Sequence, residues 1–182
     1  MERATVSKTV DSGLCTGCGV CAGICPRGCI GWKLRDGIHQ PQIDPEACVR
    51  CGLCASVCPG LGHRYAPAGD AVTTVTGPVR ACFNAWSRDA QVRHVSASGG
   101  VVTTLVRSLL DAGDYDSVFC LDSYDYREQL CTRRHTTDTL LSGDERGMTP
   151  KSRYLPVSHQ EAVRYLLSHR EERIIFIATS CA

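Results

Sequence analysis

Cysteine is the residue type with the clearest chemical implication in this sequence. Eight of the thirteen cysteines form two runs with the spacing C-x2-C-x2-C-x3-C-P, and each position of the second run lies 33 residues after its counterpart in the first. This is the spacing of thiolate ligands to 4Fe–4S clusters, in which the fourth cysteine of each run ligates the cluster of the other run. The sequence therefore predicts two metal clusters, one held by Cys15, Cys18, Cys21 and Cys58 and the other by Cys48, Cys51, Cys54 and Cys25.

Two other uses of cysteine fit these runs less well. Structural zinc needs two C-x2-C pairs, so the third and fourth cysteines of each run would have no role. Disulfide frameworks are typical of small secreted proteins, but residues 1–10 contain no apolar stretch that resembles a signal peptide. Because clusters assemble on reduced thiols, we expect a cytoplasmic protein.

Composition argues against two classes of partner. The formal net charge is only +1 and no basic face is legible, whereas nucleic-acid binding normally needs a concentration of positive charge. No apolar run approaches the roughly 20 residues of a transmembrane helix. We therefore expect no nucleic acid, no membrane span, and a redox partner protein or subunit instead.

Short local elements must position the cysteine runs. Two predicted strands, over 30–34 and 38–43, flank Asp36-Gly37, a dipeptide typical of two-residue hairpin turns. Residues 60–77 are rich in Gly, Ala, Pro and Thr, which predicts a linker. The expected domain boundary lies near residue 70, giving a cluster domain over 1–70 and a second domain over 71–182.

The second domain alternates between strand and helix patterns. Strands are predicted over 79–86, 117–121 and 173–178, the last of them buried, and a helix over 101–112 closed by Gly113. Ser158-x-x-Glu161 is a capping box that predicts the start of a further helix. The predicted fold class is α+β: a ferredoxin-like domain followed by an α/β layer with a partly parallel sheet. The apolar face expected on the first helix comprises Val102, Leu105, Val106, Leu109 and Leu110.

Hydroxyl and glycine residues gather over 96–100, where the predicted strand leads into this helix. Their free N–H groups at a helix start suit a phosphate or the edge of a flat ring. An ordinary explanation is equally available, because Ser98 suits an N-cap and the glycines suit a tight turn. The residues alone leave both interpretations open.

The order of these motifs resembles the beta-subunit family of coenzyme F-420 hydrogenases and dehydrogenases. The matching stretches are the two cysteine runs, GPVRACFNAWSRDAQVRHVSASGGVVTTLV, KSRY and the terminal FIATSC. The resemblance implies a flavoprotein in which FAD, bound in the α/β domain, exchanges electrons with the two clusters and reduces a deazaflavin (coenzyme F-420) or other organic acceptor. The cofactor-binding residues that it implies are Ser96, Ser98, Gly99, Gly100, Thr103, Lys151, Ser152, Arg153 and Tyr154.

The chain departs from the family pattern near its end. Ala178-Thr179-Ser180-Cys181-Ala182 stands where the family has Gly-Thr-Pro-Cys-Gln, which leaves the role of Cys181 open. Family members continue beyond this point, so we expect a truncated, split or fragmentary protein that acts as an oxidoreductase if a C-terminal half completes it. The alternative is a non-enzymatic ferredoxin-type electron carrier that lacks flavin.

The other cysteines and the histidines carry no ligand spacing. We expect Cys82 and Cys120 to be small buried residues of strands, and Cys29 to belong to the core. None of the six histidines forms a metal-like pair, so surface positions are expected for all of them.

Overall fold

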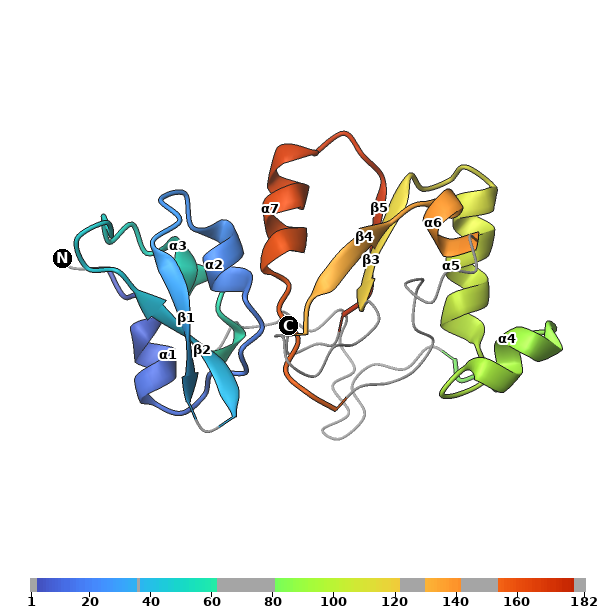
Figure 1. Ribbon diagram of the computed structural model, residues 1–182, viewed down its shortest axis with the longest axis horizontal. Helices are drawn as coiled ribbons and strands as arrows, with labels where there is room; N and C mark the ends of the chain where they lie inside the picture. The colour runs from blue at the N-terminus through green and yellow to red at the C-terminus, as the bar shows by residue number, and fades with distance from the viewer. Residues whose placement is uncertain (1–2, 36, 62–80, 122–129, 142–153, 179–182) are drawn as a thin grey trace.

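The computed structural model describes residues 3–35, 37–61, 81–121, 130–141 and 154–178, which form two lobes (Figure 1). The expected domain boundary near residue 70 lies outside these ranges. The first lobe contains α1 (Ser7–Asp11), α2 (Val20–Ile24), β1 (Ile30–Arg35), β2 (Ile38–Ile43), α3 (Leu53–Ser56) and the 3-10 turn η1 (Pro59–Leu61). The second lobe contains α4 (Ala90–Val95), α5 (Val101–Asp111), β3 (Ser117–Leu121), β4 (Thr132–His135), α6 (Thr137–Leu141), α7 (Gln160–Ser168) and β5 (Ile174–Phe176).

The predicted hairpin of the first lobe is confirmed. Strands β1 and β2 pair antiparallel, with Ile30 opposite Ile43 at one end and Arg35 opposite Ile38 at the other. Gly37 has a φ of +78°, the left-handed conformation that a tight turn requires and that glycine adopts without steric cost. Asp36 lies outside the described residues.

The duplication is visible in the backbone as well as in the cysteine spacing. Helices α2 and α3 both begin after a left-handed glycine, Gly19 with φ +80° and Gly52 with φ +83°. Two residues earlier the same conformation occurs at Gly17 with φ +75° and at Arg50 with φ +50°. Arg50 is strained there, because a side chain in this region costs about 1–2 kcal/mol. The turn around each run is therefore kept even where the residue type has changed.

A mixed three-stranded sheet forms the centre of the second lobe. Its order is β4-β3-β5, with β4 antiparallel and β5 parallel to β3, which agrees with the partly parallel sheet predicted from the sequence. Because side chains alternate along a strand, β3 presents Val118 and Cys120 to the α5 residues Val106 and Leu110. Phe119 faces the other way, and its ring lies 5.4 Å from that of Tyr165 in α7. Helices α5 and α7 thus cover opposite faces of the sheet (Figure 1).

Two strand predictions need correction. Residues 81–86 form no strand, and their side chains are exposed, with Phe83 at 86%. Alternating apolar residues do not form a strand unless a neighbouring strand pairs with them. Strand β5 is shorter than predicted and only partly buried, because it lies at the edge of the sheet. Cys82 is consequently exposed rather than buried, whereas Cys120 is buried as expected.

The helix predictions are correct in position but not in every detail. Helix α5 matches, and Gly113 ends it with φ +71° and an N–H bond to the Leu110 carbonyl. Its buried face consists of Thr103, Val106 and Leu110, whereas Val102 and Leu105 are each 56% exposed. The width of the buried stripe depends on how much sheet the helix meets, and the sequence does not contain that information.

The capping box predicted for α7 is wrong. The N-cap is His159, without a side-chain cap, and the Ser158 backbone instead forms a bridge with Cys131. The surface expectation is also wrong for His159 and His135, which are both buried, while His94 and His169 are exposed. His63 lies outside the described residues. The described helices include none long and apolar enough to cross a bilayer.

Candidate functional site

The first group of predicted ligands converges as the crossed pattern requires. Cys15, Cys18 and Cys21, from the loop and start of α2, line one pocket together with Cys58 from the second run. We call this pocket the first cage. A hydroxyl adjoins it, because Thr9 of α1 lies with its Oγ1 3.3 Å from the Cys58 sulfur and is itself buried.

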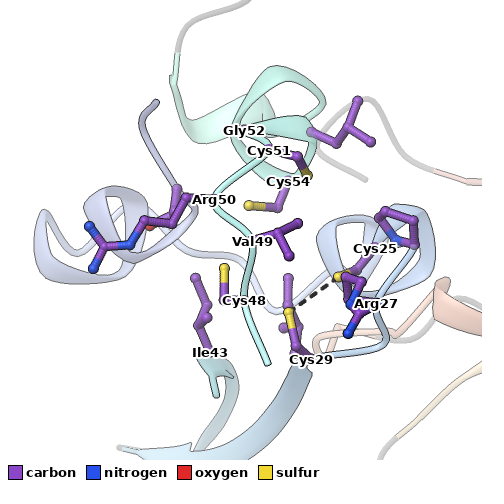
Figure 2. Close-up of a pocket in the computed structure, with 14 residues that line it drawn as sticks. Cys25, Arg27, Cys29, Ile43, Cys48, Val49, Arg50, Cys51, Gly52 and Cys54 are labelled. Atoms are coloured by element: carbon purple, nitrogen blue, oxygen red, sulfur yellow. Dashed lines mark hydrogen bonds between the residues drawn. The ribbon is translucent and has the colours of Figure 1, made fainter. Parts of the chain in front are cut away.

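The second group of predicted ligands converges in the same way. Cys48, Cys51 and Cys54 line a pocket with Cys25 from the first run, and we call this pocket the second cage (Figure 2). A fifth cysteine, Cys29, also lines it. The sequence prediction placed Cys29 in the core, and it does pack there, but its sulfur also lies 3.5 Å from that of Cys25.

Burial controls the ionisation of the first-cage thiols. It raises the pKa of Cys21 to about 12, and the nearby thiols of Cys18 and Cys15 add to the effect. Burial also raises the pKa of Cys15, although the Gly17 N–H opposes it. A metal ion that binds here must therefore displace protons, since thiolate and not thiol is the ligand.

The second cage contains thiols of opposite character. Burial disfavours the Cys25 thiolate, but hydrogen bonds from the Cys29 and Arg27 backbone and from the Cys29 thiol outweigh it and lower the pKa of Cys25. Burial and the contact with Cys25 raise the pKa of Cys29 to about 12. Burial raises the pKa of Cys54, although hydrogen bonds from the Val6 and Ala55 N–H groups partly lower it. Cys25 is thus the more easily ionised member of the Cys25–Cys29 pair.

The donor set of each cage fits an iron–sulfur cluster. Each cage holds four predicted thiolate ligands, and backbone N–H groups point at their sulfurs, as they do around clusters of this kind. Among the described residues, no three Cys, His, Asp or Glu side chains lie close enough to hold one metal ion between them. A 4Fe–4S cluster can bind thiolates that lie farther apart than the ligands of a single metal ion, because each thiolate binds a different iron atom of the cluster.

Helix α7 of the second lobe packs directly against the first cage. The His159 N–H donates to the Cys18 carbonyl at 2.8 Å, and Trp32, which lines the cage, donates its indole N–H to the Gln160 side chain at 2.8 Å. The approach leaves no room for a side chain at Gly23 of α2, since a Cβ there would lie 2.6 Å from the Val163 Cβ. Sequence reasoning missed this contact, because it joins residues more than 100 positions apart.

His159 links the first cage to the end of the sheet. Its backbone contacts Cys18, while its ring lies 5.2 Å from that of Phe176 in β5 and its Nδ1 is 3.3 Å from the Thr132 hydroxyl. Burial lowers the pKa of His159, which favours the neutral imidazole. No sequence signal marked this residue, because a single histidine without a spaced partner is usually a surface residue.

The candidate flavin loop is organised around Ser87, which the sequence analysis did not single out. The Ser87 N–H donates to the Gly99 carbonyl at 2.6 Å, and Thr104 donates its hydroxyl to Ser87 Oγ at 2.7 Å. Gly100 is the left-handed N-cap of α5 and has no side chain with which to cap the first N–H groups of that helix. The first N–H groups of α5 have no partner within the helix and suit other acceptors.

The predicted flavin residues occupy different environments. Ser96 donates its hydroxyl to the Val92 carbonyl, Thr103 is buried in α5, and Ser98 is exposed. Tyr154 is 95% exposed, so it does not pack in the core of the described structure. Lys151, Ser152 and Arg153 lie outside the described residues, as does Cys181. The assignment of all these residues to FAD stays a prediction.

Two cages with four predicted thiolate ligands each, in a duplicated fold, define an iron–sulfur protein of the two-cluster ferredoxin class. The family model for a 4Fe–4S dicluster domain matches residues 14–60. The model for the N-terminal domain of the coenzyme F-420 hydrogenase/dehydrogenase beta subunit matches residues 82–162. No curated protein sequence matches the chain significantly.

The two matches confirm the resemblance to the coenzyme F-420 hydrogenase/dehydrogenase beta-subunit family that the motifs predicted. Its iron–sulfur domain and its beta-subunit domain are those of an electron-transfer oxidoreductase subunit. The second match ends inside α7, the helix that packs on the first cage.

Proposed function

We propose that the protein is a cytoplasmic flavoprotein subunit that passes electrons from a low-potential donor through two 4Fe–4S clusters to FAD, and from there to a deazaflavin or other organic acceptor. The observation that carries this proposal is the contact between the His159 N–H and the Cys18 carbonyl at 2.8 Å. It joins a ligand loop of the first cage to the lobe that matches the beta-subunit domain. A carrier that used only its ferredoxin lobe would not need this contact.

The surroundings of the two cages suggest a direction of transfer. Exposed side chains border both cages, Leu14 the first and Val49, Arg50 and Leu53 the second, but the first cage also contacts α7 through Cys18 and Trp32. We therefore assign entry of electrons from a redox partner to the second cage and exit to the first. When bound, the clusters would supply one-electron transfer and FAD would supply two-electron chemistry.

The flavin part of the proposal is supported by the family match and by the start of α5. The uncapped N–H groups after Gly100 fit a phosphate group, since helix N-termini attract anions. Ser87 holds the loop in place through Gly99 and Thr104. These residues would bind and orient the cofactor, and Lys151 and Arg153 would supply positive charge.

Cofactor content tests the proposal. Protein purified without oxygen should contain about eight iron and eight sulfide per chain together with stoichiometric FAD. The Gly99→Val variant should lose FAD and keep iron, because a Cβ at Gly99 would lie 2.8 Å from the Ala85 carbonyl oxygen and displace the loop. Gly31→Val is a matched control in β1, where the nearest atom to a Cβ is 3.9 Å away, and it should keep both cofactors.

Full iron content without any flavin in the unaltered protein would contradict the flavoprotein proposal. The electron-carrier alternative would then remain, because it requires the clusters alone.

A further inference from the structure

The second cage contains one thiol more than the four that a 4Fe–4S cluster needs. Five cysteines line it, Cys25, Cys29, Cys48, Cys51 and Cys54, whereas the described lining of the first cage holds four. The extra cysteine is not part of the duplication, because the residue 33 positions after Cys29 is Gly62. The two cages therefore differ in their number of available ligands.

The Cys29 sulfur lies at the position where a ligand would be needed. It is 3.5 Å from the Cys25 sulfur and interacts with the thiol of Cys48 as well. Figure 2 shows it between these two side chains, on the cage side of the loop. The Asp44 N–H holds the Cys29 carbonyl at 2.8 Å beside the start of β1, so the position is fixed by the hairpin.

A buried cysteine is often only a small apolar residue, and Cys29 is 8% exposed and belongs to the core of this lobe. Two features separate it from a simple core residue. Its neighbours include the sulfurs of two predicted ligands rather than aliphatic groups alone. It also shares one corner of the cage with Cys25, which is less deeply buried.

We propose that Cys29 is a reserve ligand of the second cluster, able to take the corner otherwise held by Cys25. In the exchange the iron–sulfur bond to Cys25 breaks, a bond to the Cys29 sulfur forms, and the proton of the Cys29 thiol passes to Cys25. No electrons are gained or lost. The inference rests on the proposed function, since it requires that the second cage binds a cluster.

The consequence is that the second cluster tolerates loss of its crossed ligand and the first does not. The matched position in the first cage is Cys58, which comes from the equivalent place in the other run and has no additional cysteine among the described residues of its cage. Substitution of Cys25 and Cys58 by alanine therefore compares the same change with and without a reserve thiol.

Native mass spectrometry of protein purified without oxygen counts the clusters on each chain. We expect two intact clusters in the unaltered protein, in Cys25→Ala and in Cys29→Ala, and one in Cys58→Ala and in the double variant C25A/C29A. EPR of the reduced protein should show an altered signal for one cluster in Cys25→Ala. The cluster in the unaffected cage reports that each variant has folded.

The outcomes separate this inference from the proposed function. No cluster in the unaltered protein would overturn both. Two clusters in the unaltered protein but one in Cys25→Ala, as in the double variant, would overturn the reserve ligand alone. If Cys25→Ala does not fold, C25V compared with C25V/C29A answers the same question, because valine fills the space without offering iron a ligand, and a second cluster lost between the two belongs to the Cys29 thiol.

Discussion

The two cages are built from the same sequence motif but have different surroundings. Gly23 on α2 contacts α7 closely, whereas its counterpart on α3, 33 positions later, is the exposed Ser56. Thr9 adds a hydroxyl to the first cage, and Cys29 adds a thiol to the second. Duplication thus supplies two equal ligand sets, and the elements that pack around them make the two centres unequal.

The largest expected effect comes from adding a methyl group where α7 contacts the first cage. Gly19 and Gly52 are equivalent, and alanine at either position costs about 1–2 kcal/mol because φ is positive. At Gly19 the new Cβ would also lie 2.5 Å from Ser158 Oγ, which adds about 1–3 kcal/mol. Gly19→Ala should therefore destabilise the protein more than Gly52→Ala and loosen α7.

Hydrogen exchange of the α7 amides and urea unfolding measure this difference. Gly52→Ala is the matched control, because its Cβ would meet mainly the flexible side chain of Arg3 at 3.1 Å. Equal destabilisation and equal α7 exchange in the two variants would show that the packing of α7 on the first cage contributes nothing.

A smaller effect is expected from pH in protein stripped of iron by a chelator. Cys21 has a pKa of about 12 in the folded chain and near 9.0 when unfolded, so the folded state holds its proton longer. The contribution of Cys21 to the free energy of unfolding is therefore complete below about pH 8, and it is lost as pH rises from 9 towards 12. At pH 10 the loss from Cys21 is about 1 kcal/mol.

Urea unfolding at pH 8 and pH 10 tests this expectation. Between these pH values the Cys21→Ala variant should lose less free energy of unfolding than the unaltered protein. The cluster-loaded protein should lack the Cys21 contribution, because that sulfur is already a bound thiolate. A stability that does not change between the two pH values would contradict the burial argument for the first cage.

The smallest effect concerns the reduction potential of the first cluster. With Cys58 bound as a thiolate, only the Thr9 hydroxyl has a proton to donate across their 3.3 Å contact, and this bond favours the more negative, reduced cluster. Thr9→Val removes a bond of about 1 kcal/mol, which corresponds to about 40 mV for one electron. The potential of the first cluster should fall by at most that amount, because the bond exists in both oxidation states and only the difference in its strength shifts the potential.

A spectroelectrochemical titration followed by EPR gives both potentials. The second cluster is the internal control, since Thr9 is not part of the described lining of its cage. A shift of both potentials together would indicate a general change of the lobe rather than loss of one hydrogen bond.

Local spacing was sufficient to predict the parts of the site that a continuous segment encodes. The eight cysteines of the two runs line the two cages, joined by Cys29 in the second, and their role as cluster ligands stays a prediction. Gly37 and Gly113 marked a turn and a helix end correctly. The reason is that ligand spacing and positive φ are properties of a few consecutive residues.

Features that depend on contacts between distant segments were not predictable. Residues 81–86 have a strand pattern but no strand partner, and the buried stripe of α5 follows the sheet that it meets. The roles of His159 and Ser87 depend on neighbours outside their own segments, and that of Cys29 depends partly on Cys48 in the other run. A single sequence does not indicate which surfaces of the folded chain pack against one another.

Trp32 connects the metal-binding lobe to its neighbour through one indole ring. The ring lines the first cage, and its N–H bonds Gln160 on α7. A tryptophan in such a position is an intrinsic optical probe: separation of the lobes would change its emission, and iron in the adjacent cage would quench it. The protein thus contains an intrinsic fluorophore at the junction of the two lobes. The Trp32→Phe variant is the control that separates the emission of Trp32 from that of Trp86.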